Sequence, residues 1–277
     1  ATALGRQAKA TANQTIAIGY LANADANQAI AIGDQALAND SYSIAIGSAA
    51  EATGDRSIAL GYQAFASGEN AAALMVCAQS IGRNALAFGQ FAYASGNNSL
   101  ALGVDARATS VASFAVGVGS NATHTNGFAF GSYANAQGVN AFAVGSNAFA
   151  SGTNSFAMGP NAYASGNDSF AMGPGTRAIG DGSFALGDAA YDAPSANDSL
   201  ETGDGATVYG SNASAYGTCA LAMQANSYAY GSHANALAPN SISSGTNSQT
   251  GGSNSIALGQ FARTYGTTNF SQSVNAV

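Results

Sequence analysis

The chain has 277 residues, of which only 8% are charged, and it carries a net charge of −7. Globular proteins usually contain about 25% charged residues, so amide and hydroxyl side chains must keep this surface soluble. Seven basic residues scattered along the chain form no patch, which excludes nucleic acid as a partner. No run of about 20 apolar residues occurs, so this segment is not expected to contact or span a membrane.

Glycine recurs at intervals of fourteen residues along Gly5–Gly187 and again along Gly203–Gly259. Met75 stands in one of these places and Ser273 in the last, so that 18 of 20 places hold glycine. Two extra residues fall within 188–198, between the two runs. A period of this kind indicates a repeat protein. We predict a single domain over residues 1–277, made of about twenty coils with a two-residue insertion in 188–198.

Each repeat contains two segments that alternate with a period of two residues, which is the pattern of a β-strand. Residues 98–103 read Asn-Ser-Leu-Ala-Leu-Gly, and residues 148–152 read Ala-Phe-Ala-Ser-Gly. Fourteen residues are too few for a strand, a helix and a return, but they suit two short strands and two tight turns. The sequence therefore predicts an all-β fold, a parallel β-solenoid in which successive coils stack about 4.8 Å apart.

The middle residue of the first strand is alanine in 17 of 20 coils, and large apolar residues such as Ile16 and Ile18 flank it. Alternation sends the alanine to one face of the strand and its neighbours to the other. Either the large residues fill the coil and the chain is a monomer, or the alanine lies inside. Because this position seldom varies, we favour an alanine interior, with the Ala22–Ala24 pair of the second strand opposite. The large residues would then need a partner, which predicts a homo-oligomer.

The unit Asn254–Gly259 resembles the YadA-like head of the trimeric autotransporter adhesins, and the resemblance covers Ala1 to about Phe270. It implies a left-handed parallel β-roll and a homotrimer. It also implies display on the surface of a Gram-negative bacterium, with an outer-membrane anchor in regions outside this segment. The family's neck sequence is not evident at 271–274.

The resemblance further implies adhesion to matrix proteins, host cells or solid surfaces, and no enzymatic activity. Large aromatic residues in the outward positions of the second strand are the candidate ligand-binding residues, because coil packing gives no reason for them. They are Phe65, Phe91, Tyr93, Tyr133, Phe149 and Tyr163. A passive structural spacer without its own ligand is the alternative function.

No arrangement of residues suits a metal or a cofactor. His124 and His233, the only histidines, fall eight coils apart and cannot share a ligand. Cys77 and Cys219 fall ten coils apart, too far for a disulfide within the chain.

Acidic residues gather around the insertion, but we expect a surface loop there and not a catalytic site. They are Asp188, Asp192, Asp198, Glu201 and Asp204. Glu201 replaces the alanine of its coil, so we expect that coil to open and Glu201 to meet solvent or a polar donor.

Overall fold

The computed structural model describes residues 1–265 and 270–272 and divides the chain into two compact units, Ala1–Gln137 and Gly138–Val277. Within the described residues it contains no helix, and three-residue strands alternate with two-residue strands. Valine, isoleucine and aromatic residues flanking alanine favour the longer strands, and the adjoining Gly and Asn residues favour turns.

In unit 1 the three-residue strands form one parallel sheet. They are β1 (Thr2–Leu4), β3 (Ile16–Ile18), β5 (Ile30–Ile32), β7 (Ile44–Ile46), β9 (Ile58–Leu60), β11 (Ala72–Leu74), β13 (Leu86–Phe88), β15 (Leu100–Leu102), β17 (Phe114–Val116) and β19 (Phe128–Phe130). The two-residue strands form the other. They are β2 (Lys9–Ala10), β4 (Asn23–Ala24), β6 (Leu37–Ala38), β8 (Glu51–Ala52), β10 (Phe65–Ala66), β12 (Gln79–Ser80), β14 (Tyr93–Ala94), β16 (Arg107–Ala108), β18 (Asn121–Ala122) and β20 (Asn135–Ala136).

Unit 2 repeats this arrangement. Its three-residue strands are β21 (Phe142–Val144), β23 (Phe156–Met158), β25 (Phe170–Met172), β27 (Phe184–Leu186), β29 (Leu200–Thr202), β31 (Ser214–Tyr216), β33 (Tyr228–Tyr230), β35 (Ile242–Ser244), β37 (Ile256–Leu258) and β39 (Phe270–Gln272). Its two-residue strands are β22 (Phe149–Ala150), β24 (Tyr163–Ala164), β26 (Arg177–Ala178), β28 (Tyr191–Asp192), β30 (Thr207–Val208), β32 (Leu221–Ala222), β34 (Asn235–Ala236), β36 (Gln249–Thr250) and β38 (Arg263–Thr264).

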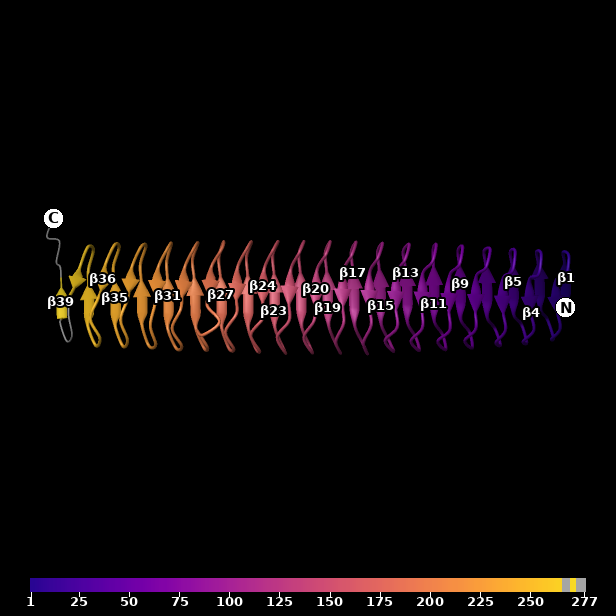
Figure 1. Cartoon of the computed structure of the whole chain (residues 1–277), viewed down its shortest axis with the longest axis horizontal. Helices are drawn as coiled ribbons and strands as arrows, with labels where there is room; N and C mark the ends of the chain where they lie inside the picture. Colours follow the sequence, from indigo (N-terminus) through magenta and orange to yellow (C-terminus); the bar gives the residue numbers. More distant parts are fainter. Residues whose placement is uncertain (266–269, 273–277) are drawn as a thin grey trace. The chain divides into compact units, whose positions relative to one another are not determined.

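Equivalent strands of successive coils pair in parallel, which confirms the predicted solenoid (Figure 1). Ile16 pairs with Ile30 and Ala17 with Ala31, an offset of fourteen residues. We call the residues at one position of successive coils a column. Because the offset equals the repeat, each column holds the residues at one position of the repeat.

The insertion is smaller than the predicted loop at Asp188–Asp198. Phe184 pairs with Leu200, so the offset rises to sixteen residues in this one coil. Pro194 and Ser195 are exposed, whereas the alanines on either side of them remain buried. The two extra residues are therefore accommodated at this turn, and the strands before and after it keep their pairing.

Alanine fills the interior, as expected. Ala17 of the first strand and Ala22 and Ala24 of the second are completely buried, whereas Ile16 and Ile18 are only half-buried on the outside. The alternative with large residues inside the coil is therefore wrong. The interior is thin, because among the described residues no fully buried side chain is larger than that of Glu201.

Two turns close each coil, and their residue types follow from the backbone conformation. Gly33 has a φ of +139°, and a Cβ placed there would lie 2.3 Å from the carbonyl oxygen of Gly47 in the next coil. Only glycine permits that approach. At the opposite turn, Asn154 has a φ of 56°, a conformation in which asparagine is enriched. Ser155 follows it and donates a 2.7 Å hydrogen bond to the carbonyl oxygen of Gly152 across the turn.

Candidate functional site

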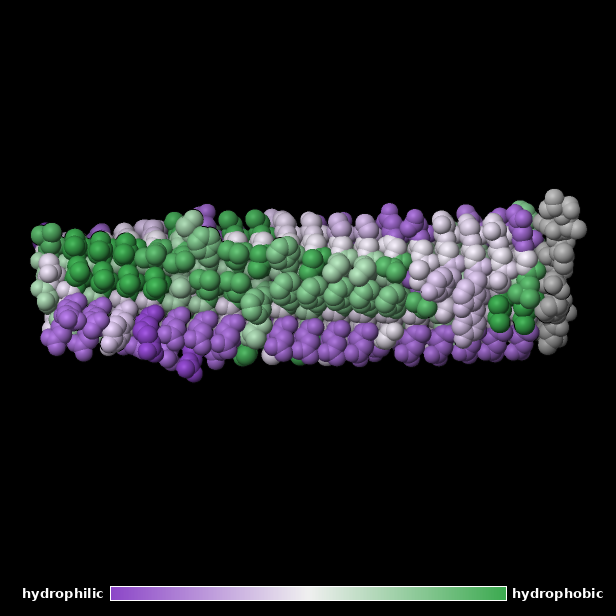
Figure 2. All heavy atoms as spheres, turned by 180° about the vertical axis from the view of Figure 1, so that it is seen from behind, coloured by the Kyte–Doolittle hydropathy of each residue, from purple (hydrophilic) through white to green (hydrophobic). Residues whose placement is uncertain are grey.

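The outward apolar residues of the three-residue strands form what we call the apolar stripe. In unit 1 it appears as a green band bordered by hydrophilic side chains (Figure 2). Ile46, Phe88 and Phe130 are 40%, 42% and 50% exposed. Exposed apolar surface of this extent marks an interaction site in soluble proteins.

Aromatic rings of the apolar stripe stack on one another in unit 2. Phe156 lies 4.8 Å from Phe142 and 4.7 Å from Phe170, measured between ring centroids, and the ring planes are parallel within 4°. Phe184 continues the stack at 4.6 Å. This stacking follows from the coil spacing, because each ring lies directly beside its equivalent in the next coil.

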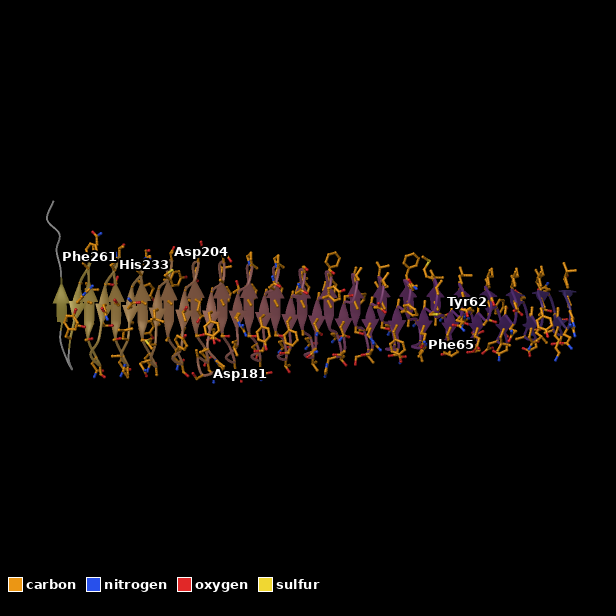
Figure 3. The ribbon with its side chains drawn as sticks, turned by 45° about the horizontal axis from the view of Figure 1, so that its top comes forward. Tyr62, Phe65, Asp181, Asp204, His233 and Phe261 are labelled. Carbon is orange, nitrogen blue, oxygen red and sulfur yellow. The ribbon has the colours of Figure 1, made fainter. Side chains whose placement is uncertain are left out.

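Four of the six predicted ligand-binding residues lie on the two-residue strands β10, β14, β22 and β24, and Phe91 and Tyr133 lie in the turns before β14 and β20. Phe91 and Tyr133 are 50% and 61% exposed, and the other four are half-buried. Phe65 projects from the outside of β10 (Figure 3). They fall in both units and do not converge on one site.

In unit 2 the outer residues of the two-residue strands form a stacked column. The rings of Phe149 and Tyr163 are 5.0 Å apart and parallel within 7°. The guanidinium of Arg177 lies 5.0 Å from the Tyr163 ring and 5.8 Å from the Tyr191 ring, in cation–π contact with both. Phe149 and Tyr163 therefore do have a packing role, contrary to the sequence-based interpretation. One face of Phe149 and both faces of Tyr163 are used in these contacts.

Tyr133 and Phe65 have different surroundings. The Tyr133 ring lies against Gly119 of the preceding coil, where a Cβ would approach it to 2.7 Å. Glycine at that position thus leaves room for the ring. Phe65 pairs through its backbone with Glu51 and Gln79, and its side chain takes part in none of the ring contacts of the described residues.

In unit 1 a groove of about 450 Å³ brings Phe91 and Tyr93 together with charged residues of the next coil. We call it the aromatic groove. It is lined by Cys77, Gln79, Phe91, Tyr93, Asp105 and Arg107. Alternation creates it, because the alanine between each outward pair points into the coil and leaves backbone as the floor.

The aromatic groove combines apolar rings with two opposite charges. Arg107 lies over the Tyr93 ring at 5.7 Å. Every ion pair that the described residues form involves Arg56 or Arg83, so neither Arg107 nor Asp105 is ion-paired there. The groove can therefore take a ligand with an apolar part and a charged or dipolar group. Sequence reasoning found Phe91 and Tyr93 but missed Asp105 and Arg107, although their spacing of fourteen residues from that pair was the available signal.

Near the insertion, two carboxyl groups are enclosed in the interior. Asp192 Oδ2 accepts hydrogen bonds from the backbone N–H groups of Ile179, at 2.8 Å, and of Gly180, and Asp192 Oδ1 accepts one from Ser199 Oγ at 2.9 Å. In other coils the N–H at the position of Ile179 donates to a main-chain carbonyl of the next coil. Here the Asp192 carboxylate takes the place of that carbonyl as the acceptor. Burial raises the pKa of Asp192, and these hydrogen bonds partly offset the rise.

Glu201 lies inside its coil, contrary to the expectation that this coil opens. Its side chain is completely buried, and neither carboxyl oxygen has a hydrogen-bond partner. Burial, and then the negative charge of Asp192, raise the pKa of Glu201 to about 9. The prediction that Glu201 meets solvent or a polar donor is therefore wrong. The parallel pairing of β29 with both neighbours holds the strand in register and keeps the side chain inside.

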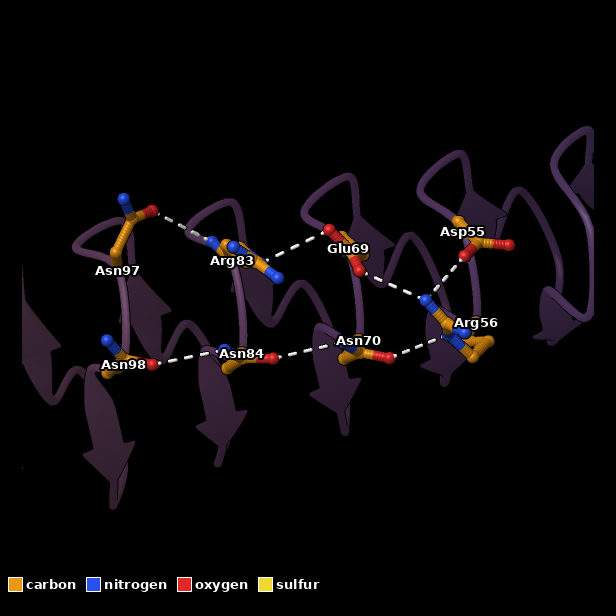
Figure 4. A network of polar contacts seen from close by, with 8 residues as sticks. All are labelled: Asp55, Arg56, Glu69, Asn70, Arg83, Asn84, Asn97 and Asn98. Atoms are coloured by element: carbon orange, nitrogen blue, oxygen red, sulfur yellow. Dashed lines mark hydrogen bonds and ion pairs between the residues drawn. The ribbon is translucent and has the colours of Figure 1, made fainter.

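Polar side chains join successive coils on the turns of unit 1 (Figure 4). Arg56 contacts Asp55 at 2.8 Å and Glu69 at 3.0 Å, and Glu69 also contacts Arg83 at 3.2 Å. Beside these ion pairs, Asn70 donates to the side-chain oxygen of the next asparagine along the column at 3.0 Å. This network connects coils, and its charged side chains pair with one another.

The described residues contain no cluster of His, Cys, Asp and Glu that could hold a metal ion. His124 and His233 contact only their neighbouring hydroxyl groups, at 3.1 Å and 2.9 Å, among the side-chain hydrogen bonds of the described region. Cys77 and Cys219 are free thiols. Over the same residues, nothing helical is long and apolar enough to cross a membrane.

The stacked coils, the alanine interior and the exposed apolar stripe define a parallel β-solenoid repeat protein. The model of one family, the YadA head domain repeat, matches most of the chain, and the chain belongs to that family. The matched residues are 1–22, 24–50, 52–74, 80–106, 108–134, 136–162, 164–190 and 236–262. Residues 191–235, which hold the inserted turn and Glu201, lie outside the matches. A search of curated proteins finds no significant match. The family points to an adhesin-type surface domain.

Proposed function

We propose that the chain is a head domain of a trimeric adhesin on the surface of a Gram-negative bacterium. Each chain is a left-handed β-roll forming a single domain, and three copies pack their apolar stripes together around a common axis. An anchor in the outer membrane belongs to other parts of the protein. Family membership supports this, and the exposed apolar stripe is the observation that carries it.

Burial of the apolar stripe supplies the energy for assembly. A large apolar side chain contributes about 1.5–3 kcal/mol when it is fully buried. Each coil with two large residues in the stripe offers twice that amount. Packing of identical copies covers a repeated stripe more completely than an unrelated partner could, because the coil spacing is the same in every copy.

With the apolar stripe covered in the trimer, the opposite face of each chain mediates adhesion. The aromatic groove is the strongest candidate there, since it holds exposed ring surface and two charges without ion-pair partners. Phe65 and Tyr133 of unit 1, and Phe149 and Tyr163 of unit 2, are the further candidates, with Phe149 and Tyr163 contributing mainly their ring edges. Repetition over three chains and many fibres would turn weak contacts with matrix protein, host cell or solid surface into firm attachment.

The test is a variant with Phe91, Tyr93, Phe149 and Tyr163 changed to Ser. We expect it to keep the mass of the parent and to lose adhesion to collagen-coated, cell-coated and polystyrene surfaces. Tyr62→Ser is the matched control, because Tyr62 is 51% exposed but lies outside the aromatic groove. Equal adhesion of parent and quadruple variant would place the adhesive surface elsewhere, and no adhesion by the parent would favour a passive spacer.

A further inference from the structure

A second groove lies on the turns that follow β2, β4 and β6 and shares no residue with the aromatic groove. It has a volume of about 480 Å³ and is lined by Asn13, Gln14, Asn27, Gln28 and Tyr42. We call it the amide groove. All five side chains are exposed. The volume lies within the roughly 300–1,000 Å³ that small-molecule sites occupy.

The backbone sets these side chains side by side. Gln14, Gln28 and Tyr42 occupy one column and share a φ near +60°. The N–H of Gln28 donates to the carbonyl of Asn13 at 2.9 Å, and the N–H of Tyr42 donates to that of Asn27 at the same distance. The groove is therefore built on three hydrogen-bonded coils.

The amides of this groove differ from those farther along the same columns. Asn84 accepts from Asn70 at 3.0 Å and donates to Asn98 at 3.1 Å, so its amide is occupied (Figure 4). The side-chain amides that line the amide groove take part in none of the hydrogen bonds of the described residues. Each offers two donors and an acceptor to a ligand.

Tyr42 adds an available aromatic ring. It is 52% exposed, and no other ring or cation of the described region stacks on it. The cation in the next coil, Arg56, is engaged with Asp55 and Glu69 instead. The ring can therefore pack against an apolar ligand surface at little entropic cost.

The four amides and the aromatic ring of the amide groove favour one chemical class of ligand. None of the five lining residues is charged, so the groove has no group that prefers an anion or a cation. Amides pair with hydroxyl groups, which both donate and accept, and an aromatic ring packs on the C–H face of a pyranose. We propose that the amide groove binds neutral saccharides. This site shares no residue with the aromatic groove and does not depend on the adhesion proposed for it.

The experiment uses the full chain and three neutral probes, namely maltotetraose, cellotetraose and chitotetraose, with binding measured by saturation-transfer NMR and calorimetry. We expect at least one probe to bind. Tyr42→Ala should weaken that binding about tenfold, which corresponds to about 1.4 kcal/mol. Tyr42→Phe should retain it because the ring remains, and Gln14→Ala with Gln28→Ala should weaken it.

Tyr62→Ala is the matched control, because Tyr62 is 51% exposed against 52% for Tyr42 but lies on the other turn. It should bind as the parent does, and the melting temperature of each variant checks its fold. Failure of all three probes to bind, or equal binding by Tyr42→Ala and the parent, would overturn the proposal. Tighter binding of sulfated maltotetraose would also overturn it. The Phe91 and Tyr93 variants should keep saccharide binding, so the two proposals fail separately.

Discussion

Glu201 occupies a position that alanine holds in most coils, and its carboxyl group there lowers the stability of the folded chain. Its carboxyl group is enclosed without a hydrogen-bond partner, which costs about 1–3 kcal/mol. We predict that Glu201→Ala raises the free energy of unfolding at neutral pH by about that amount. Chemical denaturation or the melting temperature measures it. A lower stability of the variant would mean that the cavity it leaves costs more than the buried carboxyl group.

The same residue makes stability depend on pH. The pKa of Glu201 is raised from 4.5 to about 9, so between these values the folded chain holds a proton that the unfolded chain has released. The free energy of unfolding therefore falls as the pH rises from 4.5 to about 9. Below pH 4.5 the carboxyl group is protonated in both states, and this loss of stability is absent. The raised pKa of Asp192 acts in the same direction. Glu201→Ala should reduce the slope of melting temperature against pH, and an unchanged slope would contradict the enclosed position.

Gly33 stands at one of the glycine positions that recur every fourteen residues, and we predict that alanine cannot replace it without a large loss of stability. In Gly33→Ala the new Cβ would meet the Gly47 carbonyl oxygen at 2.3 Å, so the coils must separate. We expect a loss of more than about 3 kcal/mol. Gly175→Ala is the control, because the nearest atom to its Cβ is 4.0 Å away and Ala189 already adopts a similar φ of 51° in the next coil. That variant should melt close to the parent.

At the scale of single strands, the two sheets use stacking for different purposes. The Phe142–Phe184 column belongs to the apolar stripe and the Phe149–Tyr163 pair to the outer face. Both have rings about 5 Å apart, because both inherit the coil spacing. Stacking alone therefore does not tell which face is covered in the assembled protein.

A pair of substitutions separates the two faces. Phe156→Asp should place a charge from each chain in the proposed trimer core, cost several kcal/mol and reduce the mass measured by light scattering. Phe149→Asp disturbs an equivalent ring stack on the outer face and should leave the mass unchanged. If both variants keep the mass of the parent, the apolar stripe does not hold the chains together.

For the whole molecule, assembly and stability should be linked. When three chains fold and associate together, the melting temperature rises with protein concentration. We expect this rise for the parent and its loss for Phe156→Asp. Because the chain holds only 7 basic and 14 acidic residues, added salt should change the melting temperature little. A melting temperature independent of concentration would indicate a stable single chain.

The sequence alone determined the repeat, the two strands of each coil and the alanine interior. These features depend on a local pattern of fourteen residues that recurs down the chain, and parallel stacking converts it directly into columns. The strong preference for alanine in this column, in 17 of 20 coils, was enough to choose between the two possible interiors, since a solvent-facing column would vary freely.

The tertiary structure decided what the repeat does not encode. Enclosure of Glu201, the use of Asp192 as a replacement acceptor and the small size of the inserted turn all depend on how strands before and after the insertion stay paired. The two grooves each join side chains from two columns and three coils. The period sets these side chains in neighbouring coils, but the structure shows which of them line a groove. A periodic pattern specifies the neighbours along a column, whereas contacts between columns depend on the shape of the turns and on which side chains already have partners.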